Sequence, residues 1–144
     1  MPTPEVTEVG RNSWASILHY PDWHTLELRW LPSTSEMTDQ GFRDTLALHA
    51  GEGERYKPAL MLIDTSEFDH RLAPESLRWR DEEIVPRYNR AGVKKFAFIA
   101  SPQWAETVES GQPPSVEGRA QFPTGWFESR DHAYRWLAET RDGA

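Results

Sequence analysis

Polar side chains that could bind a ligand follow two apolar segments of the sequence, 59–63 and 96–100. They are Asp64, Thr65, Ser66, Ser101 and Gln103. In open α/β sheets, ligands bind outside the carboxyl ends of the strands. These hydroxyl, amide and carboxylate groups are therefore candidate ligand-binding groups for a polar head group. The competing interpretation is that Asp64 and Ser66 hydrogen-bond within their own loop, as Asx and Ser turns do.

Asp64, Ser66 and His70 supply the residue types of a hydrolase triad within a short stretch of sequence. The chain has no Gly-x-Ser-x-Gly sequence, which exposes the nucleophilic serine in one class of hydrolase. A triad is also defined by geometry, which closeness in sequence does not supply. A hydrolase that uses these three residues is therefore kept as a third hypothesis.

Metal and cofactor chemistry find little support in the sequence. The chain has 5 histidines and no cysteine. His19 and His24 flank a predicted turn, but no third ligand follows at a telling spacing, and no His-Glu-x-x-His helix is present. Without cysteine there is no disulfide, no thiolate nucleophile and no Cys-ligated zinc or iron–sulfur cluster. We expect no metal site and no cofactor.

Net charge and hydropathy limit the classes of binding partner and the cellular location that we expect for this protein. The 144 residues include 23 Asp and Glu against 16 Lys and Arg, a net charge of -7. Nucleic-acid affinity comes mainly from clustered Lys and Arg, so no nucleic-acid partner is expected. The longest apolar stretches are far shorter than the roughly 20 residues of a membrane-spanning helix. The N-terminus has no signal-peptide pattern, so we expect a cytoplasmic protein without a membrane span.

Hydrophobic periodicity predicts the elements that would position the candidate residues. Strands are expected over 14–20, 25–31, 59–63, 96–100 and 119–122, and helices over 38–51, 74–92, 103–109 and from 129 onward. A flexible tail over 1–12 would precede a single domain over 13–140. The predicted fold class is α/β, with an N-terminal β-hairpin, a mixed, mostly parallel sheet and packed helices in the order ββαβαβ(α)βα.

Capping and helix-breaking residues set the predicted helix limits. Thr38 offers a side-chain oxygen to the first free N–H groups of a helix. Gly51 and Gly53 are expected to end that helix by about residue 51. Pro86 lies inside the second helical pattern, where it removes a backbone donor, so we expect a kink or an early end there.

The second strand of the hairpin has a clear alternation. Leu26, Leu28 and Trp30 are apolar, and Glu27 and Arg29 lie between them. Successive side chains of a strand point to opposite faces, so this segment predicts one buried face and one wetter face.

Four segments carry a resemblance to a known family. They are IDTSEF after the central strand, PESLRWRDEEIVPR on the next helix, KKFAFIAS as the next strand and FPTGWFESRDHAYRWL near the end. With the order of elements, they resemble the SpoIIAA-like proteins, relatives of the STAS domains and, more distantly, of the CRAL-TRIO lipid-binding domains. The resemblance covers about residues 14–138. It implies a mostly parallel sheet with packed helices and, usually, no enzymatic activity.

The resemblance also raises one modification site. STAS antagonists carry an Asp-Ser pair at the start of the second helix, and a partner kinase phosphorylates that serine. This chain has Ser76 in that neighbourhood, but no Asp precedes it, and Pro74 changes the helix entry. Ser76 is therefore a weak candidate for phosphorylation.

Aromatic residues in the second half of the chain have two interpretations. They are Trp79, Trp104, Trp126, Phe127 and Trp136. They could wall an apolar pocket, as the lipid-binding relatives suggest, or belong to the core or a subunit interface. Trp104 and the segment 103–118 are the better pocket candidates, because mobile loops that carry aromatic residues can act as lids.

These observations lead to two main functional expectations. The first is a non-enzymatic regulatory or protein-interaction module of the STAS/SpoIIAA-like type with an unknown protein partner, and a homodimer is one form of it. The second is a carrier of a small apolar or amphipathic ligand bound between the sheet and the helices.

Overall fold

The structure is a computed structural model, and it describes residues 5–99 and 124–143. The described strands are β1 (Thr7–Arg11), β2 (Ala15–Tyr20), β3 (Thr25–Trp30), β4 (Leu60–Asp64), β5 (Lys95–Ile99) and β6 (Thr124–Phe127). The described helices are α1 (Asp39–Tyr56), α2 (Pro74–Trp79), α3 (Val85–Ala91) and α5 (Arg130–Gly143), with the short turns η1 (Pro21–Trp23) and η2 (Pro32–Glu36) and the π-helix η3 (Arg80–Ile84).

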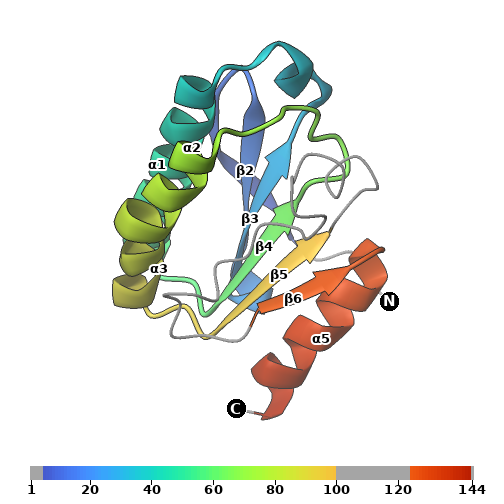
Figure 1. Ribbon diagram of the computed structural model, residues 1–144. Coiled ribbons are helices and arrows are strands. Elements are labelled where there is room, and N and C mark those ends of the chain that lie inside the picture. Colours follow the sequence, from blue (N-terminus) through green and yellow to red (C-terminus); the bar gives the residue numbers. More distant parts are fainter. Residues whose placement is uncertain (1–4, 100–123, 144) are drawn as a thin grey trace.

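The strands form one six-stranded mixed sheet in the order β1-β2-β3-β4-β5-β6. β1, β2 and β3 are antiparallel neighbours, and β3 to β6 run parallel. The predicted α/β class and the hairpin are thus confirmed. α1, α2 and α3 cover one face of the sheet and α5 lies on the other (Figure 1).

The central strand β4 is buried at every position, and all of its residues except the last, Asp64, are apolar. Met61 and Ile63 pack with α1 and α3 in the larger core, which includes Phe42 and Tyr88. Leu60 and Leu62 belong to a second cluster, completed by Ala97, Ile99, Ala133 and Leu137. A strand covered by helices on both faces requires such a continuous apolar run.

The tail expected over residues 1–12 contains a strand. Thr7–Arg11 pairs with β2 as the edge strand β1, and the register shifts between Glu8 and Gly10. The segment was not recognised because Val9 is its one apolar residue. Three of its five residues are exposed, so no alternation marks it.

Helix α1 continues past the predicted end near residue 51 to Tyr56. Thr38 caps its start, since the Thr38 side chain accepts a hydrogen bond from the N–H of Gly41. Gly53 lies inside the helix, where a Cβ atom would come within 2.9 Å of the Met61 methyl group. This glycine therefore permits close packing of α1 on β4, and the helix ends instead at Tyr56, which is followed by Lys57 with φ 48°.

The irregularity expected around Pro86 takes the form of the π-helix η3, which separates α2 from α3. Pro86 occupies the first turn of α3. Residues 74–91 form one continuous helical run, so the absent N–H of Pro86 removes a backbone hydrogen bond directly after the π-helix. The strand predicted over 119–122 and the helix predicted over 103–109 lie outside the described residues.

The final helix agrees with its predicted start. Ser129 precedes α5 and its Oγ accepts a hydrogen bond from the N–H of His132 at 3.3 Å. Over the described part of the chain, no helix is long and apolar enough to cross a membrane.

Candidate functional site

The predicted residues at the end of β4 are hydrogen-bonded within the chain. Asp64 Oδ1 accepts hydrogen bonds from the N–H and the hydroxyl of Ser66, at 2.9 and 2.5 Å. Thr65 donates to the carbonyl of Ile99 from its N–H, at 2.8 Å, and from its hydroxyl. Asp64 and Ser66 therefore hydrogen-bond to each other within their own loop, as the competing interpretation of these residues described. Ser101, Gln103 and Trp104 lie outside the described residues.

The second oxygen of Asp64 accepts a hydrogen bond from Arg130, the first residue of α5. Arg130 also binds Glu27 with two parallel hydrogen bonds, at 2.8 and 2.9 Å. Glu27 is 0% exposed. Bidentate pairs between Arg and carboxylates are the strong form of this interaction. Arg130 therefore links β3, β4 and α5 through two carboxylates.

Further donors surround Glu27 on the same face of the sheet. The Tyr20 hydroxyl donates to Glu27 at 2.6 Å, and Arg29 Nε donates at 2.9 Å. Tyr134 Oη lies 2.6 Å from Arg130 and 3.2 Å from the Tyr20 hydroxyl. Glu27 lies on the face predicted to be wetter, but it is buried because these long side chains cover it. We call Tyr20, Glu27, Arg29, Arg130 and Tyr134 the Glu27 cluster.

Burial and charge in the Glu27 cluster act on its titrating groups. Burial, followed by the charge of Glu27, raises the pKa of Tyr20 and of Tyr134. Burial alone would lower the pKa of Arg130, but its hydrogen bonds to Glu27 and the charge of Glu27 outweigh burial and raise it. Arg130 is therefore held as a cation and both phenols stay protonated at neutral pH.

His70 and Ser76 meet at Asp39, the first residue of α1. Asp39 Oδ1 lies 2.7 Å from His70 Nε2. Asp39 Oδ2 accepts hydrogen bonds from the Ser76 hydroxyl, at 2.6 Å, and from the N–H of Ala73, at 3.0 Å. His70 thus pairs with Asp39 and not with Ser66, so Asp64, Ser66 and His70 do not form the arrangement of a hydrolase triad. Ser76 is 1% exposed, and its hydroxyl is engaged by the partly exposed carboxylate of Asp39.

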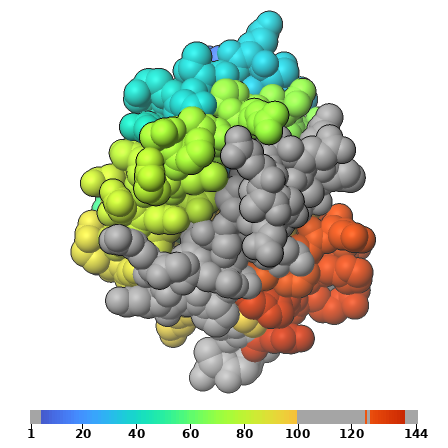
Figure 2. All heavy atoms as spheres, viewed as in Figure 1, coloured from blue at the N-terminus to red at the C-terminus, as the bar shows by residue number. Residues whose placement is uncertain are grey.

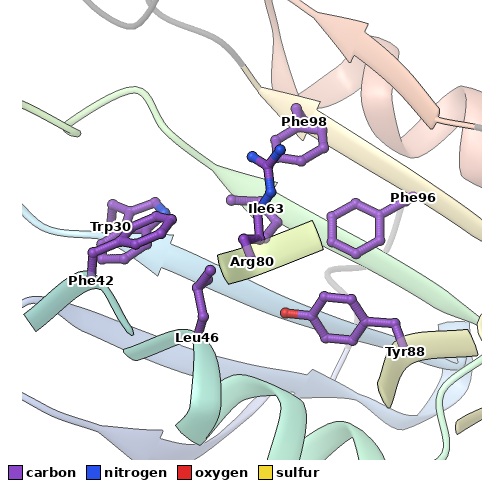
Figure 3. Close-up of a pocket in the computed structure, with 8 residues that line it drawn as sticks. All are labelled: Trp30, Phe42, Leu46, Ile63, Arg80, Tyr88, Phe96 and Phe98. Carbon is purple, nitrogen blue, oxygen red and sulfur yellow. The ribbon is translucent and has the colours of Figure 1, made fainter. Parts of the chain in front are cut away.

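A hollow lies between the sheet and the helices at η3 (Figure 3). It is lined by Trp30, Phe42, Leu46, Ile63, Arg80, Tyr88, Phe96 and Phe98. The volume of this hollow is about 20 Å³, which is room for about one water molecule. We call it the Arg80 cavity.

Two polar side chains reach the Arg80 cavity. Arg80 is 7% exposed, and its Nε and Nη2 donate to Asp81 Oδ1 at 3.1 and 3.0 Å. Figure 3 shows Arg80 directed toward Phe98 and the hydroxyl of Tyr88 directed into the hollow. That hydroxyl lies 2.8 Å from His49 Nδ1. The π-helix carries Arg80, and π-turns occur frequently at functional sites.

Of the aromatic residues expected to share a pocket, those whose side chains the structure describes are divided between the two faces of the sheet. Trp79 packs against the larger core, with the Arg43 guanidinium 5.5 Å from its ring. Phe127 and Trp136 pack together on the other face, at 5.4 Å between ring centroids. The Arg80 cavity is lined by other aromatic residues, which belong to β3, β5, α1 and α3. Sequence patterns could not separate these from ordinary core residues, because both are apolar and buried.

Among the residues with described positions, no group of three or more His, Asp and Glu side chains is placed to hold a metal ion. In comparisons with protein-family models, curated proteins and solved structures, no match to this chain was found.

Proposed function

We propose that the protein is a non-enzymatic regulatory or protein-interaction module of the STAS/SpoIIAA-like type. In the mixed sheet, α1 connects β3 to β4, and α2 and α3 connect β4 to β5. All three helices lie on one face of the sheet, an arrangement that is compatible with this type. The observation that carries the proposal is a surface on the other face. It is formed by the outer parts of the Glu27 cluster and by Trp23, and we call it the Trp23 surface.

The Trp23 surface has the residue types that dominate binding energies in protein interfaces. Trp23 lies 4.7 Å from Tyr134 between ring centroids, and it stacks on Tyr20 at 5.7 Å. The Arg29 and Arg130 side chains remain 41% and 31% exposed. Trp, Tyr and Arg are enriched among interface residues whose loss weakens binding most. Hydrogen bonds to Glu27 already order both arginines, so binding costs little further side-chain entropy.

Charge indicates what kind of partner the Trp23 surface would bind. Glu27 is fully buried beneath Arg29 and Arg130, so two partly exposed guanidinium groups reach solvent at this place although the whole chain carries a net charge of -7. We therefore propose a partner protein that presents an acidic side chain to the two arginines and apolar surface to Trp23. Such charge complementarity favours fast and specific association.

The experiment uses a photo-cross-linking amino acid at position 23, in cells of the source organism. The control carries the same group at Glu83, which is exposed on η3 and belongs to the opposite face. A partner protein cross-linked from position 23 and not from position 83 is expected. Its affinity for the purified chain should fall in Arg29→Gln and stay unchanged in Arg78→Gln, since Arg78 is exposed on α2.

Equal cross-linking from both positions, or an Arg29→Gln variant that binds like the unchanged chain, would contradict this proposal. A cross-link only between copies of the chain would replace the external partner with a homodimer.

A second candidate function is a carrier of a small apolar or amphipathic ligand bound between the sheet and the helices. The observation that favours it is the Arg80 cavity, which lies between these layers. The pocket predicted beside Trp104 stays a prediction.

A further inference from the structure

A row of three polar side chains crosses the antiparallel strands beside the Trp23 surface. In the register of the sheet, Arg11 of β1 lies opposite Ser16 of β2, and Ser16 lies opposite Arg29 of β3. Residues directly opposite each other in antiparallel strands share one face of the sheet. Arg11, Ser16 and Arg29 are therefore neighbours on one face, and we call them the Arg11 row.

The Arg11 row lies on the face that carries the Glu27 cluster. Arg29 and Glu27 are two positions apart on β3, and side chains at this spacing point to the same face. The helix on this face, α5, packs on β5 and β6. These strands are at the other edge of the sheet from β1 (Figure 1). The helix therefore lies away from β1, where the Arg11 side chain is exposed.

Both arginines of the row have free hydrogen-bond donors. Arg29 donates to Glu27 through Nε, and its side chain is 41% exposed. Within the part of the chain that the structure describes, neither terminal nitrogen of Arg29 has a hydrogen-bond partner, and the Arg11 side chain has none at all. Arg130 differs, because its terminal nitrogens already donate to Glu27, Asp64 and Tyr134.

The middle of the row already holds a carboxylate of this chain. The Ser16 hydroxyl donates to Glu8 Oε2 at 2.6 Å. Glu8 is exposed, and in the described residues it forms no ion pair with Arg11 or Arg29. Two cations thus flank one anion, and the guanidinium groups remain open to acids from outside the chain.

We infer that Arg11 binds a second acidic side chain of the partner protein. The inference rests on the proposed function and deepens it, because Arg29 belongs to both the Trp23 surface and the Arg11 row. Neighbouring strands are about 4.8 Å apart, so the backbones at Arg11 and Arg29, two strands apart, are separated by roughly 10 Å. The partner would present two carboxylates at a similar spacing, one to each arginine.

The chemistry of these contacts determines what they contribute. Arginine presents a planar fork of N–H donors that matches a carboxylate. An ion pair between exposed side chains adds little affinity, so the contact at Arg11 acts mainly on the rate and the specificity of association. Arg11 thereby selects partners that carry the second acid.

The first test repeats the cross-linking in cells with the photo-reactive amino acid at position 8. That position contacts Ser16, between the two arginines, and leaves both of them in place. The partner captured from position 23 should also be captured from position 8. The control is position 75 on α2, where Glu75 is exposed, and it should capture no partner. Figure 2 shows the surfaces of α2 and α5 on different sides of the molecule, in green and red.

The second test measures the association rate of the purified chain with that partner. Arg11→Gln should slow association roughly two- to fivefold at low salt, and the difference should shrink at high salt. Arg11→Lys keeps the positive charge and should associate at close to the rate of the unchanged chain. This rescue would not follow if Arg11 acted only through its shape.

The neighbouring acid supplies a change of opposite sign. Glu8→Gln keeps an oxygen that can accept from Ser16 and removes a negative charge that repels the partner's carboxylates, so association should become faster. Glu75→Gln, on the opposite face, is the matched control and should leave the rate unchanged.

The outcomes separate this inference from the proposed function. Capture from position 23 and not from position 8 overturns the inference alone, and so do Arg11→Gln and Glu8→Gln variants that associate like the unchanged chain. Capture from position 8 and not from position 23 contradicts the proposed function, which depends on Trp23. If neither position captures a partner, both proposals are wrong.

Discussion

Arg130, at the start of α5, holds the fully buried Glu27 of β3 by two hydrogen bonds across 103 positions of sequence. The same guanidinium reaches Asp64 at the end of β4. The parallel strands β3 and β4 are neighbours, with Arg29 opposite Asp64 in the register. One side chain thus fixes the last helix to the centre of the sheet and orders the Trp23 surface.

The first prediction concerns this link. Arg130→Met should lower the free energy of unfolding by about 2–3 kcal/mol, because it leaves Glu27 buried with fewer partners. The effect stays below that of a fully buried pair, since Arg29 still binds Glu27 and Arg130 is partly exposed. Urea unfolding measures it. The control is Arg135→Met, an exposed position of α5, and an equal loss in both variants would contradict the prediction.

The second prediction concerns acid stability through His49. Burial lowers the pKa of His49 from 6.5 to about 3, and the backbone carbonyl of Leu26 has a smaller effect in the opposite direction. The unfolded chain therefore binds a proton below pH 6.5 that the folded chain does not bind. Stability should fall as the pH falls from 6.5 toward 3, by at most about 1.4 kcal/mol per pH unit from this group.

The measurement for His49 is the unfolding free energy against pH. His49→Gln should flatten the curve in that window, whatever its effect at pH 7. His132→Gln, at an exposed position of α5, is the control and should keep the slope. The prediction is wrong if His49→Gln retains the slope of the unchanged chain.

The third prediction concerns Asp39 at lower pH. Burial alone would raise the pKa of Asp39, but hydrogen bonds from Ser76, His70 and Ala73 outweigh burial and lower it below 3.8. Its stabilising contribution is complete above pH 3.8 and is lost as the pH falls through the lowered value. Asp39→Asn should remove this part of the acid unfolding. Asp22→Asn, at an exposed position of η1, should leave the unfolding curve unchanged.

The fourth prediction compares two glycines of α1. At Gly41 a Cβ atom would lie 2.8 Å from both Met37 Cγ and Trp14 Nε1, so Gly41→Ala should destabilise by about 1–3 kcal/mol. At Gly51 the nearest atom is Arg87 Nη2 at 3.8 Å, so Gly51→Ala should stabilise by about 0.5–1 kcal/mol through helix propensity. Thermal unfolding of both variants checks the signs, and equal signs would contradict the packing argument.

Local sequence patterns determined most of the elements of this fold. The apolar run at 59–63, the alternation in β3, the cap at Thr38 and the irregularity near Pro86 depend on neighbouring residues, so they could be recognised without tertiary structure. Edge strand β1 and the true end of α1 could not. β1 gains its stability from pairing with β2, and Gly53 stays helical because it packs on Met61.

The candidate sites were decided by tertiary structure. The end of β4 was correctly placed by sequence reasoning, but nothing local pairs Asp64 with Arg130 or His70 with Asp39. Glu27 was expected on a wetter face, and hydrogen bonds from Tyr20, Arg29 and Arg130 explain how a buried strand position carries a carboxylate. Arg80 lies in the segment 78–83, whose many charged residues are typical of a solvent-exposed helix face. It enters the core because η3 packs against α1 and the sheet, a relationship between distant segments that no local pattern contains.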